Sequence, residues 1–139
     1  MARDLVHLTV VMVSDIVGST TLRAALGERR ATEVFSTLEV TTTEVVVGFG
    51  GRIVKHLGDG TLAVFPSAAQ ALEAAAAVQV SATELDDLGG DDHGLAIRVG
   101  LAVGDVDAVG EDVAGMPVVV AARLCDRADD GQILADQAV

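Results

Sequence analysis

The hydrophobic positions of this chain form short apolar runs that are separated by glycine-rich turns. Residues 6–15, VHLTVVMVSD, are apolar and β-branched with little alternation, which predicts a strand buried on both faces. The stretches GRIVKHL (51–57) and TLAVF (61–65) are also strand-like. Because a Gly-Asp-Gly turn at residues 58–60 separates them, they are predicted to form a tight hairpin.

Helical segments alternate with these strands. The stretch from residue 20 to 47 is predicted to be helical with a break near Gly27, and Ser19 or Thr20 can cap its start. The remaining elements are an alanine-rich helix at 67–85 capped by Ser67, a polar loop at 86–94, a strand running into a hairpin arm at 95–109, a helix at 115–128 with Pro117 in its first turn, and a short strand at 131–135. The order β-α-α-β-β-α-β-α-β predicts an α+β, ferredoxin-like sandwich with a mostly antiparallel sheet, in a single domain over residues 1–139.

Composition narrows the classes of partner. The chain has 21 acidic residues against 9 basic ones, and its net charge of −12 argues against nucleic acid or an anionic membrane as a partner. A nucleotide triphosphate would also be repelled unless divalent cations inverted the local field. No apolar run is long enough to span a membrane, and no membrane contact is expected. The single cysteine, Cys125, fits a reducing, cytoplasmic location.

Two aspartates are placed where a metal ion could bind both. Asp15 ends the first apolar strand and Asp59 lies in the hairpin turn, and the predicted sandwich puts that strand beside the hairpin. Crowded carboxylates stay ionised when a cation lies between them, and oxygen ligands favour Mg²⁺ or Mn²⁺. The following IVGST offers a phosphate cradle at a helix N-terminus, which together with a metal indicates phosphoryl transfer. Taken singly, each aspartate also fits an ordinary turn or cap residue.

Three spaced blocks of the sequence resemble a known family, the class III nucleotidyl cyclases. The family's opening motif, an aspartate followed by Ile, a variable residue, Gly and Ser or Thr, stands here as SDIVGST. Its hairpin motif stands as GGRIVKHLGDGTLAVF, and its third block stands as RVGLAVGDVDAVGEDVAGMPVVVAARL, followed by GQILA. The resemblance extends from about Val10 to the end, and the chain looks C-terminally short relative to the family.

The resemblance implies an adenylate cyclase, in which the ribose 3′-oxygen of ATP attacks the α-phosphate to give 3′,5′-cyclic AMP and pyrophosphate. It identifies Asp15, Ile16 and Asp59 as the metal-binding residues, with two Mg²⁺ or Mn²⁺ ions in each site. The phosphate cradle comprises Gly18, Ser19 and Thr20. Arg123 is the implied catalytic residue, because it can stabilise charge developing on the phosphates.

Lys55 is the only lysine of the chain, and it lies four positions before Asp59. The resemblance implies that Lys55 and Asp112 together recognise adenine. A lysine offers one compact donor to a ring nitrogen, while an aspartate accepts the exocyclic amine. The alternatives are an exposed strand lysine, a local salt bridge from Lys55 to Asp59, and an ordinary loop acid at position 112.

In the family the active sites lie between two subunits packed head to tail, so the resemblance implies a homodimer with shared sites. The metal aspartates would come from one subunit and the base-reading pair from the other. One position departs from the pattern, because Val119 stands where the family has an asparagine that orients the ribose. The alternative function is therefore a weak or inactive nucleotide-binding dimer with a regulatory role. A phospho-acceptor receiver domain and a diguanylate cyclase fit the LGDGT hairpin poorly.

Overall fold

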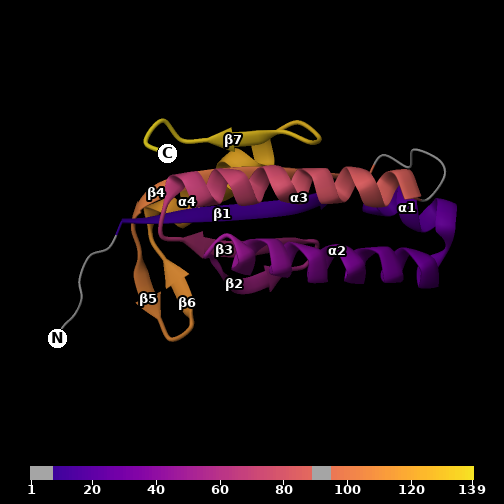
Figure 1. Ribbon diagram of the computed structural model, residues 1–139, viewed down its shortest axis with the longest axis horizontal. Coiled ribbons are helices and arrows are strands. Elements are labelled where there is room, and N and C mark those ends of the chain that lie inside the picture. The colour runs from indigo at the N-terminus through magenta and orange to yellow at the C-terminus, as the bar shows by residue number, and fades with distance from the viewer. Residues whose placement is uncertain (1–7, 89–94) are drawn as a thin grey trace.

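The computed structural model of the protein describes residues 8–88 and 95–139. Figure 1 shows a sheet built around β1, with long helices lying along it. The elements in chain order are β1 (Leu8–Val17), α1 (Ser19–Leu26), α2 (Glu28–Gly48), β2 (Arg52–Leu57), β3 (Gly60–Phe65), α3 (Ala68–Leu88), β4 (Ala96–Asp105), β5 (Asp107–Val109), β6 (Asp112–Ala114), α4 (Met116–Arg127) and β7 (Ile133–Ala135).

In the part of the chain that the structure describes, the main sheet has five strands in the order β2-β3-β1-β4-β7. The central strand β1 runs antiparallel to both of its neighbours, β3 and β4, and only β7 joins in parallel, beside β4. The first strand therefore lies beside the β2–β3 hairpin, as the sequence predicts. The arrangement confirms the α+β sandwich with a mostly antiparallel sheet.

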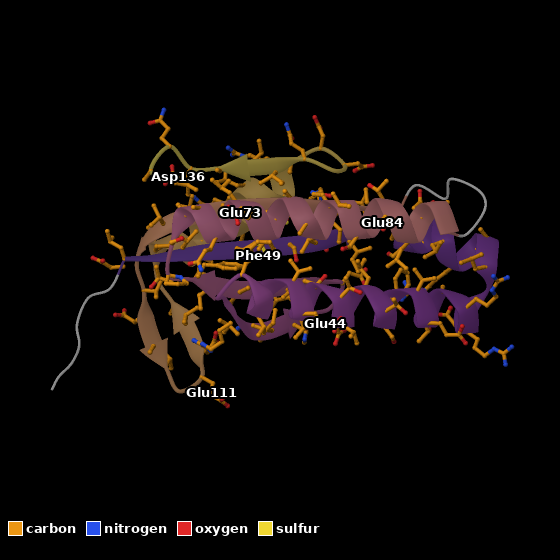
Figure 2. All side chains as sticks on the ribbon, in the orientation of Figure 1. Glu44, Phe49, Glu73, Glu84, Glu111 and Asp136 are labelled. Atoms are coloured by element: carbon orange, nitrogen blue, oxygen red, sulfur yellow. The ribbon has the colours of Figure 1, made fainter. Side chains whose placement is uncertain are left out.

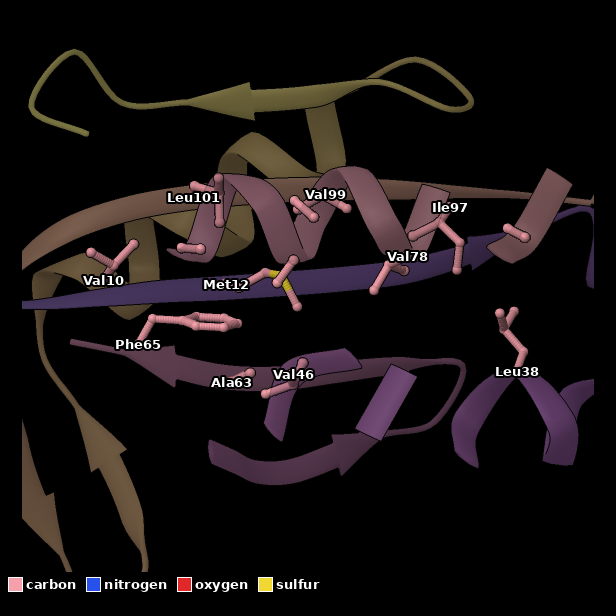
Figure 3. Packing of buried hydrophobic residues seen from close by; sticks show 14 residues of the cluster. Val10, Met12, Leu38, Val46, Ala63, Phe65, Val78, Ile97, Val99 and Leu101 are labelled. Atoms are coloured by element: carbon pink, nitrogen blue, oxygen red, sulfur yellow. The ribbon is translucent and has the colours of Figure 1, made fainter. Parts of the chain in front are cut away.

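Strand β1 is apolar almost throughout because both of its faces are covered. Val10 and Met12 belong to a core cluster that includes residues of α2 and α3, whereas Val11 and Val13 belong to a second cluster with residues of α4. This division follows from the period of two along a strand, which sends alternate side chains to opposite faces. Figure 3 shows the first cluster, in which the sheet, α2 and α3 contribute Met12, Phe65, Val46 and Val78.

Two helix boundaries occur where the sequence predicts them, but the predicted N-cap of α1 is not formed. Gly27, at a φ of 84°, separates α1 from α2, and a positive φ of this kind favours glycine. The Ser67 hydroxyl accepts a hydrogen bond from the Gln70 N–H at 3.1 Å, which confirms Ser67 as the N-cap of α3. The predicted capping of α1 by Ser19 or Thr20 is wrong, because the N-cap position is held by Gly18 without a side-chain hydrogen bond.

Three other boundaries differ from the prediction. Strand β1 continues two residues beyond Asp15, because Ile16 and Val17 still pair with β4. Helix α3 extends to Leu88, into the predicted polar loop, and residues 89–94 of that loop lie outside the described residues. The arm after β4 is a separate two-stranded hairpin, β5–β6, which projects from the body of the molecule in Figure 1.

The acidic residues lie mainly on the surface. Figure 2 shows Glu44 on α2, Glu84 on α3 and Glu111 at the tip of the β5–β6 hairpin, and all three are exposed. Within the described residues, no helix combines the length and the apolar character that crossing a bilayer requires.

Candidate active site

Asp15 and Asp59 lie on segments that the sheet joins directly. Asp15 is the register partner of Gly60, the residue that follows Asp59, and the Ile16 N–H donates a hydrogen bond to the Asp59 carbonyl at 3.0 Å. Asp15 itself lies inside β1 and not at its end, in contrast to the sequence prediction. The structure thus places the two aspartates on adjacent segments, near the C-terminal end of the central strand β1 and in the β2–β3 turn beside it.

The glycines that flank Asp59 allow this close approach. A Cβ on Gly60 would lie 2.2 Å from the Ser14 carbonyl oxygen of β1, a separation that no side chain tolerates. Gly58 has a φ of 61°, in the region that favours glycine. The Gly-Asp-Gly sequence is therefore required by the backbone geometry at the turn, and it leaves Asp59 as the only side chain there.

Ser19 connects the start of α1 to the turn. Its hydroxyl donates a hydrogen bond to Asp59 Oδ2 at 3.3 Å. Gly18 adopts a left-handed conformation at φ 86°, which lets the chain turn from β1 into α1, and Thr20 is exposed in the first turn of the helix. The GST segment, predicted as a phosphate cradle, therefore lies beside the Asp59 carboxylate.

Arg98 also belongs to this region, although the sequence motifs do not single it out. It lies on β4 as the register partner of Asp15, and its Nη2 donates to Asp15 Oδ2 at 2.5 Å. The hydrogen bond to Asp15 is the main reason why the pKa of the Arg98 guanidinium is raised above its ordinary value. The available signal was a lone arginine in an otherwise apolar strand, AIRVG, but the residue that it faces depends on register.

Arg98 is also anchored to the end of α4. Its Nη1 donates to the carbonyl of Asp126 at 3.2 Å, and the Cys125 thiol donates to the Arg98 carbonyl at 3.5 Å. Burial, with a smaller contribution from the charge of Asp15, raises the pKa of the Cys125 thiol to about 11, so the thiol stays protonated and can donate. The Arg98 guanidinium therefore joins Asp15 to the C-terminal turn of α4.

Lys55 and Asp112 form a second charged cluster. The Lys55 Nζ lies 2.9 Å from Asp112 Oδ2, although the two residues are 57 positions apart in the sequence. The hydrogen bond from Lys55 is the main cause that lowers the pKa of the Asp112 carboxyl, and the Val113 N–H, which donates to Asp112 Oδ1 at 2.7 Å, adds to it. Asp112 is therefore an ionised acceptor. Of the alternatives for Lys55, a salt bridge to Asp59 is not formed, because the lysine pairs with Asp112.

Arg123 and Val119 lie on the exposed side of α4. They are four residues apart on the helix, and therefore on one side of it, and Val119 is 41% exposed. Ala121 and Cys125, by contrast, are buried against the sheet. The structure thus leaves Arg123 in solvent and brings it into neither of the two charged clusters within this chain.

The donor set at Asp15 and Asp59 fits a cation that completes its coordination elsewhere. Within the described residues, no three or more His, Cys, Asp or Glu side chains gather as a metal site. Two carboxylates are nevertheless a common protein contribution to Mg²⁺, which keeps waters and takes further oxygen ligands from substrate phosphates. The Arg98 guanidinium on Asp15 shows that this carboxylate accepts a positively charged partner. By the chemistry of their carboxylate oxygens, Asp15 and Asp59 fit such an ion.

Comparison with known proteins gives relatives but no matching protein-family model. An uncharacterized protein of Mycobacterium tuberculosis is 35% identical over 122 residues, which cover 88% of this chain and 31% of that protein. An adenylate cyclase of Streptomyces coelicolor is 32% identical over 125 residues, covering 90% of this chain and 31% of that enzyme. The chain thus spans about a third of the length of these relatives.

Solved structures share the fold over nearly the whole chain. An adenylate/guanylate cyclase/hydrolase from Silicibacter pomeroyi is similar with a TM-score of 0.75 at 26% identity, covering 95% of this chain and 76% of that one. The adenylyl cyclase CyaB from P. aeruginosa matches with a TM-score of 0.78 at 24% identity, over 99% of this chain and 80% of that one. A guanylyl cyclase also shares the fold, with a TM-score of 0.74 at 22% identity over 99% of this chain and 78% of that one. With its motifs, its sheet order and these relatives in agreement, the chain belongs to the class III adenylate/guanylate cyclase catalytic domains.

Proposed function

We propose that this domain is an adenylate cyclase, which converts ATP to 3′,5′-cyclic AMP and pyrophosphate. The observation that carries this proposal is the Lys55–Asp112 contact at 2.9 Å, because it sets one donor and one ionised acceptor side by side. Adenine offers a ring nitrogen that accepts and an exocyclic amine that donates, so both of its groups can be satisfied there. Guanine would present a carbonyl to Asp112, and this mismatch leaves polar groups unpaired.

The triphosphate would bind at the other charged cluster. Asp15, Asp59 and the backbone of Ile16 are the groups that would hold Mg²⁺ or Mn²⁺, and the N–H groups of residues 18–20 at the start of α1 would hold phosphate oxygens. The chemistry supplied by bound cations is charge neutralisation on the triphosphate and acidification of the ribose 3′-hydroxyl. In a chain with a net charge of −12, such neutralisation is a condition for binding ATP.

The two clusters would complete each other across a dimer. Lys55 and Asp59 lie on the same hairpin, but Lys55 contacts Asp112 on β6 whereas Asp59 contacts Ser19 on α1. A head-to-tail pair with twofold symmetry would place the Lys55–Asp112 cluster of one subunit opposite the aspartates of the other, forming two equal sites. The exposed position of Arg123 on α4 fits a residue that acts on phosphates bound across that interface.

One observation favours the alternative, a nucleotide-binding regulatory domain with little or no turnover. Val119 is exposed on the same side of α4 as Arg123, and its side chain has no hydrogen-bond donor for a ribose. Loss of one preorganised donor typically costs roughly 3 kcal/mol of transition-state stabilisation. A slow enzyme is therefore expected, with turnover that Mn²⁺ assays at high protein concentration can detect.

The test is product formation by the purified chain. With Mn²⁺ and ATP we expect cyclic AMP to accumulate above the level of an Asp59→Ala control, and we expect less cyclic product from GTP than from ATP. Cyclic AMP is measured by chromatography over long incubations. No product above the control would favour the regulatory function, whereas a preference for GTP would contradict the role of Lys55 and Asp112.

Val119→Asn is expected to raise the turnover number. The change restores a donor at an exposed helix position, where substitutions disturb stability little, and its gain is about 10²-fold if one preorganised hydrogen bond is recovered. The matched control is Val119→Ala, which removes the side chain without adding a donor and should leave the rate within about twofold. Steady-state kinetics with ATP and Mn²⁺ measure both variants. Equal rates for the Asn and Ala variants would show that the ribose is oriented by another group.

A further inference from the structure

We propose that Arg98 is an internal counter-ion of Asp15, which binds this carboxylate in the cation-free protein and competes with the divalent cation for it. The inference rests on the proposed role of Asp15 as a metal-binding residue. Unlike the proposed function, it concerns Arg98 and not the metal-binding aspartates. The property it concerns is the affinity of the site for the cation in the absence of nucleotide, and not the cyclase activity.

The contact is direct and partly shielded from water. Nη2 of Arg98 lies 2.5 Å from Oδ2 of Asp15, and the exposed fractions of the two side chains are 25% and 34%. A hydrogen bond between two ionised groups is stronger than a neutral one, and partial burial weakens its screening by solvent and salt. Among the described residues, no other basic side chain pairs with Asp15, so its carboxylate would lose this counter-charge if the arginine were absent.

The two aspartates differ in whether their carboxylate is paired with a positively charged side chain. Asp59 accepts a hydrogen bond from the neutral hydroxyl of Ser19, and it forms no ion pair with a basic side chain of the described residues. Asp15 has one carboxylate oxygen occupied by a full positive charge. A cation would therefore find Asp59 accessible and Asp15 already paired.

The arginine and a divalent ion cannot both keep their best position at Asp15. At about 4 Å, like charges repel by several kcal/mol near a protein surface, and the repulsion doubles for a divalent ion. Binding of the ion at Asp15 therefore requires the guanidinium to withdraw from Oδ2 or to tolerate a weakened hydrogen bond. In either case part of the ion's binding free energy is used against the Arg98–Asp15 contact.

The other contacts of Arg98 indicate that its guanidinium can take a second position, away from Asp15. Its Nε is buried and has no hydrogen-bond partner among the described residues, so the present position leaves one donor unsatisfied. Its Nη1 donates to the Asp126 carbonyl in the last turn of α4, where the helix dipole also favours a positive charge. A guanidinium that leaves Asp15 can thus remain near the end of α4.

The first test is the affinity of the metal-free chain for Mn²⁺ alone, measured by electron paramagnetic resonance of the unbound ion. Arg98→Gln removes the competing charge, and we expect it to bind Mn²⁺ about tenfold more tightly than the wild type. Removing any arginine makes the chain more negative, so Arg127→Gln is the matched control. Arg127 is exposed at the C-terminal end of α4 and forms no ion pair with Asp15, and its loss should change the affinity by less than about twofold.

Outcomes of this test separate the inference from the proposed function. Equal or weaker Mn²⁺ binding by Arg98→Gln would overturn the inference and would make Arg98 a residue that supports the ligand position of Asp15. Asp15→Asn and Asp59→Asn should each weaken Mn²⁺ binding. If neither does, the metal site of the proposed function is wrong, whatever the result with Arg98.

A second measurement uses the wild-type chain and does not depend on the folding of a Gln variant. In ¹⁵N spectra of the arginine side chains, the Arg98 signal, assigned by its loss in Arg98→Lys, should report restricted rotation of the guanidinium without metal. Titration with diamagnetic Mg²⁺ should shift this signal and release the rotation. An Arg98 signal unchanged at saturating Mg²⁺ would show that the ion pair with Asp15 persists, and the inference would be wrong.

Discussion

A mixture of Asp15→Ala and Lys55→Ala chains is expected to recover about a quarter of the wild-type cyclase activity, although each variant alone is nearly inactive. In a shared-site dimer, a mixed pair has one site in which both substitutions meet and one site that is intact. About half of randomly formed dimers are mixed, and half of their sites work, which gives the expected fraction.

The size of the effect follows from the separation of the two clusters. Asp15 belongs to the cluster that contains Asp59, and Lys55 belongs to the cluster that contains Asp112. Each variant therefore damages a different half of a site. Asp15→Ala removes a cation-binding carboxylate, and Lys55→Ala leaves Asp112 without its partner. Losses of about a hundredfold or more are expected for the first, because catalysis here depends on electrostatic stabilisation.

The measurement is cyclic AMP formation after the two purified chains are mixed and allowed to exchange subunits. The matched control mixes Asp15→Ala with Asp59→Ala. Both of these residues belong to one cluster, so every site in that mixture lacks a metal-binding carboxylate, and no recovery is expected. Recovery in the control, or its absence in the Asp15→Ala and Lys55→Ala mixture, would contradict site sharing as described above.

Gly100→Ala is expected to lower the free energy of unfolding by about 3 kcal/mol or more. Gly100 lies in the middle of β4, where α4 crosses the sheet. A Cβ there would lie 2.1 Å from the Ala121 carbonyl oxygen and 2.5 Å from the Cys125 nitrogen. Both are backbone atoms of α4, so no side chain can rotate away, and the helix must move off the strand.

Urea unfolding followed by circular dichroism measures this change. Gly48→Ala is the matched control, because Gly48 is the last residue of α2 and an added Cβ meets no atom within 4 Å. There the alanine should be neutral or stabilise by about 0.5–1 kcal/mol through its better helix propensity. Equal stabilities of the two variants would mean that α4 does not pack on β4 as closely as the structure has it.

Displacement of α4 would also reach the candidate active site. Arg123 lies on this helix, and the Arg98 guanidinium donates to the Asp126 carbonyl at its end. A folded fraction of Gly100→Ala is therefore expected to lose activity beyond its loss of stability. The close contact between β4 and α4 is thus part of what positions both arginines.

Much of the fold could be predicted from local patterns. The apolar run of β1 and the Gly-Asp-Gly turn are patterns that can be read directly along the chain, and the break at Gly27 and the Ser67 cap depend on interactions between residues close in sequence. The extent of β1 beyond Asp15 was missed, because its last residues are held by pairing with a strand 80 positions away along the chain.

For the candidate site, too, part could be predicted from the sequence and part only from the structure. The sequence by itself determined which residue types this protein has for cation and base recognition: Asp15 and Asp59 in their motifs, a single lysine, and a valine at position 119. Only the tertiary structure decided that Lys55 pairs with Asp112 and that Arg98 pairs with Asp15. The physical reason is that both contacts join segments far apart in the sequence. The Arg98–Asp15 contact depends on the register of β4 against β1, and the Lys55–Asp112 contact depends on how the β5–β6 hairpin lies against β2. Both are determined by packing of the whole core and not by any local stretch of the chain.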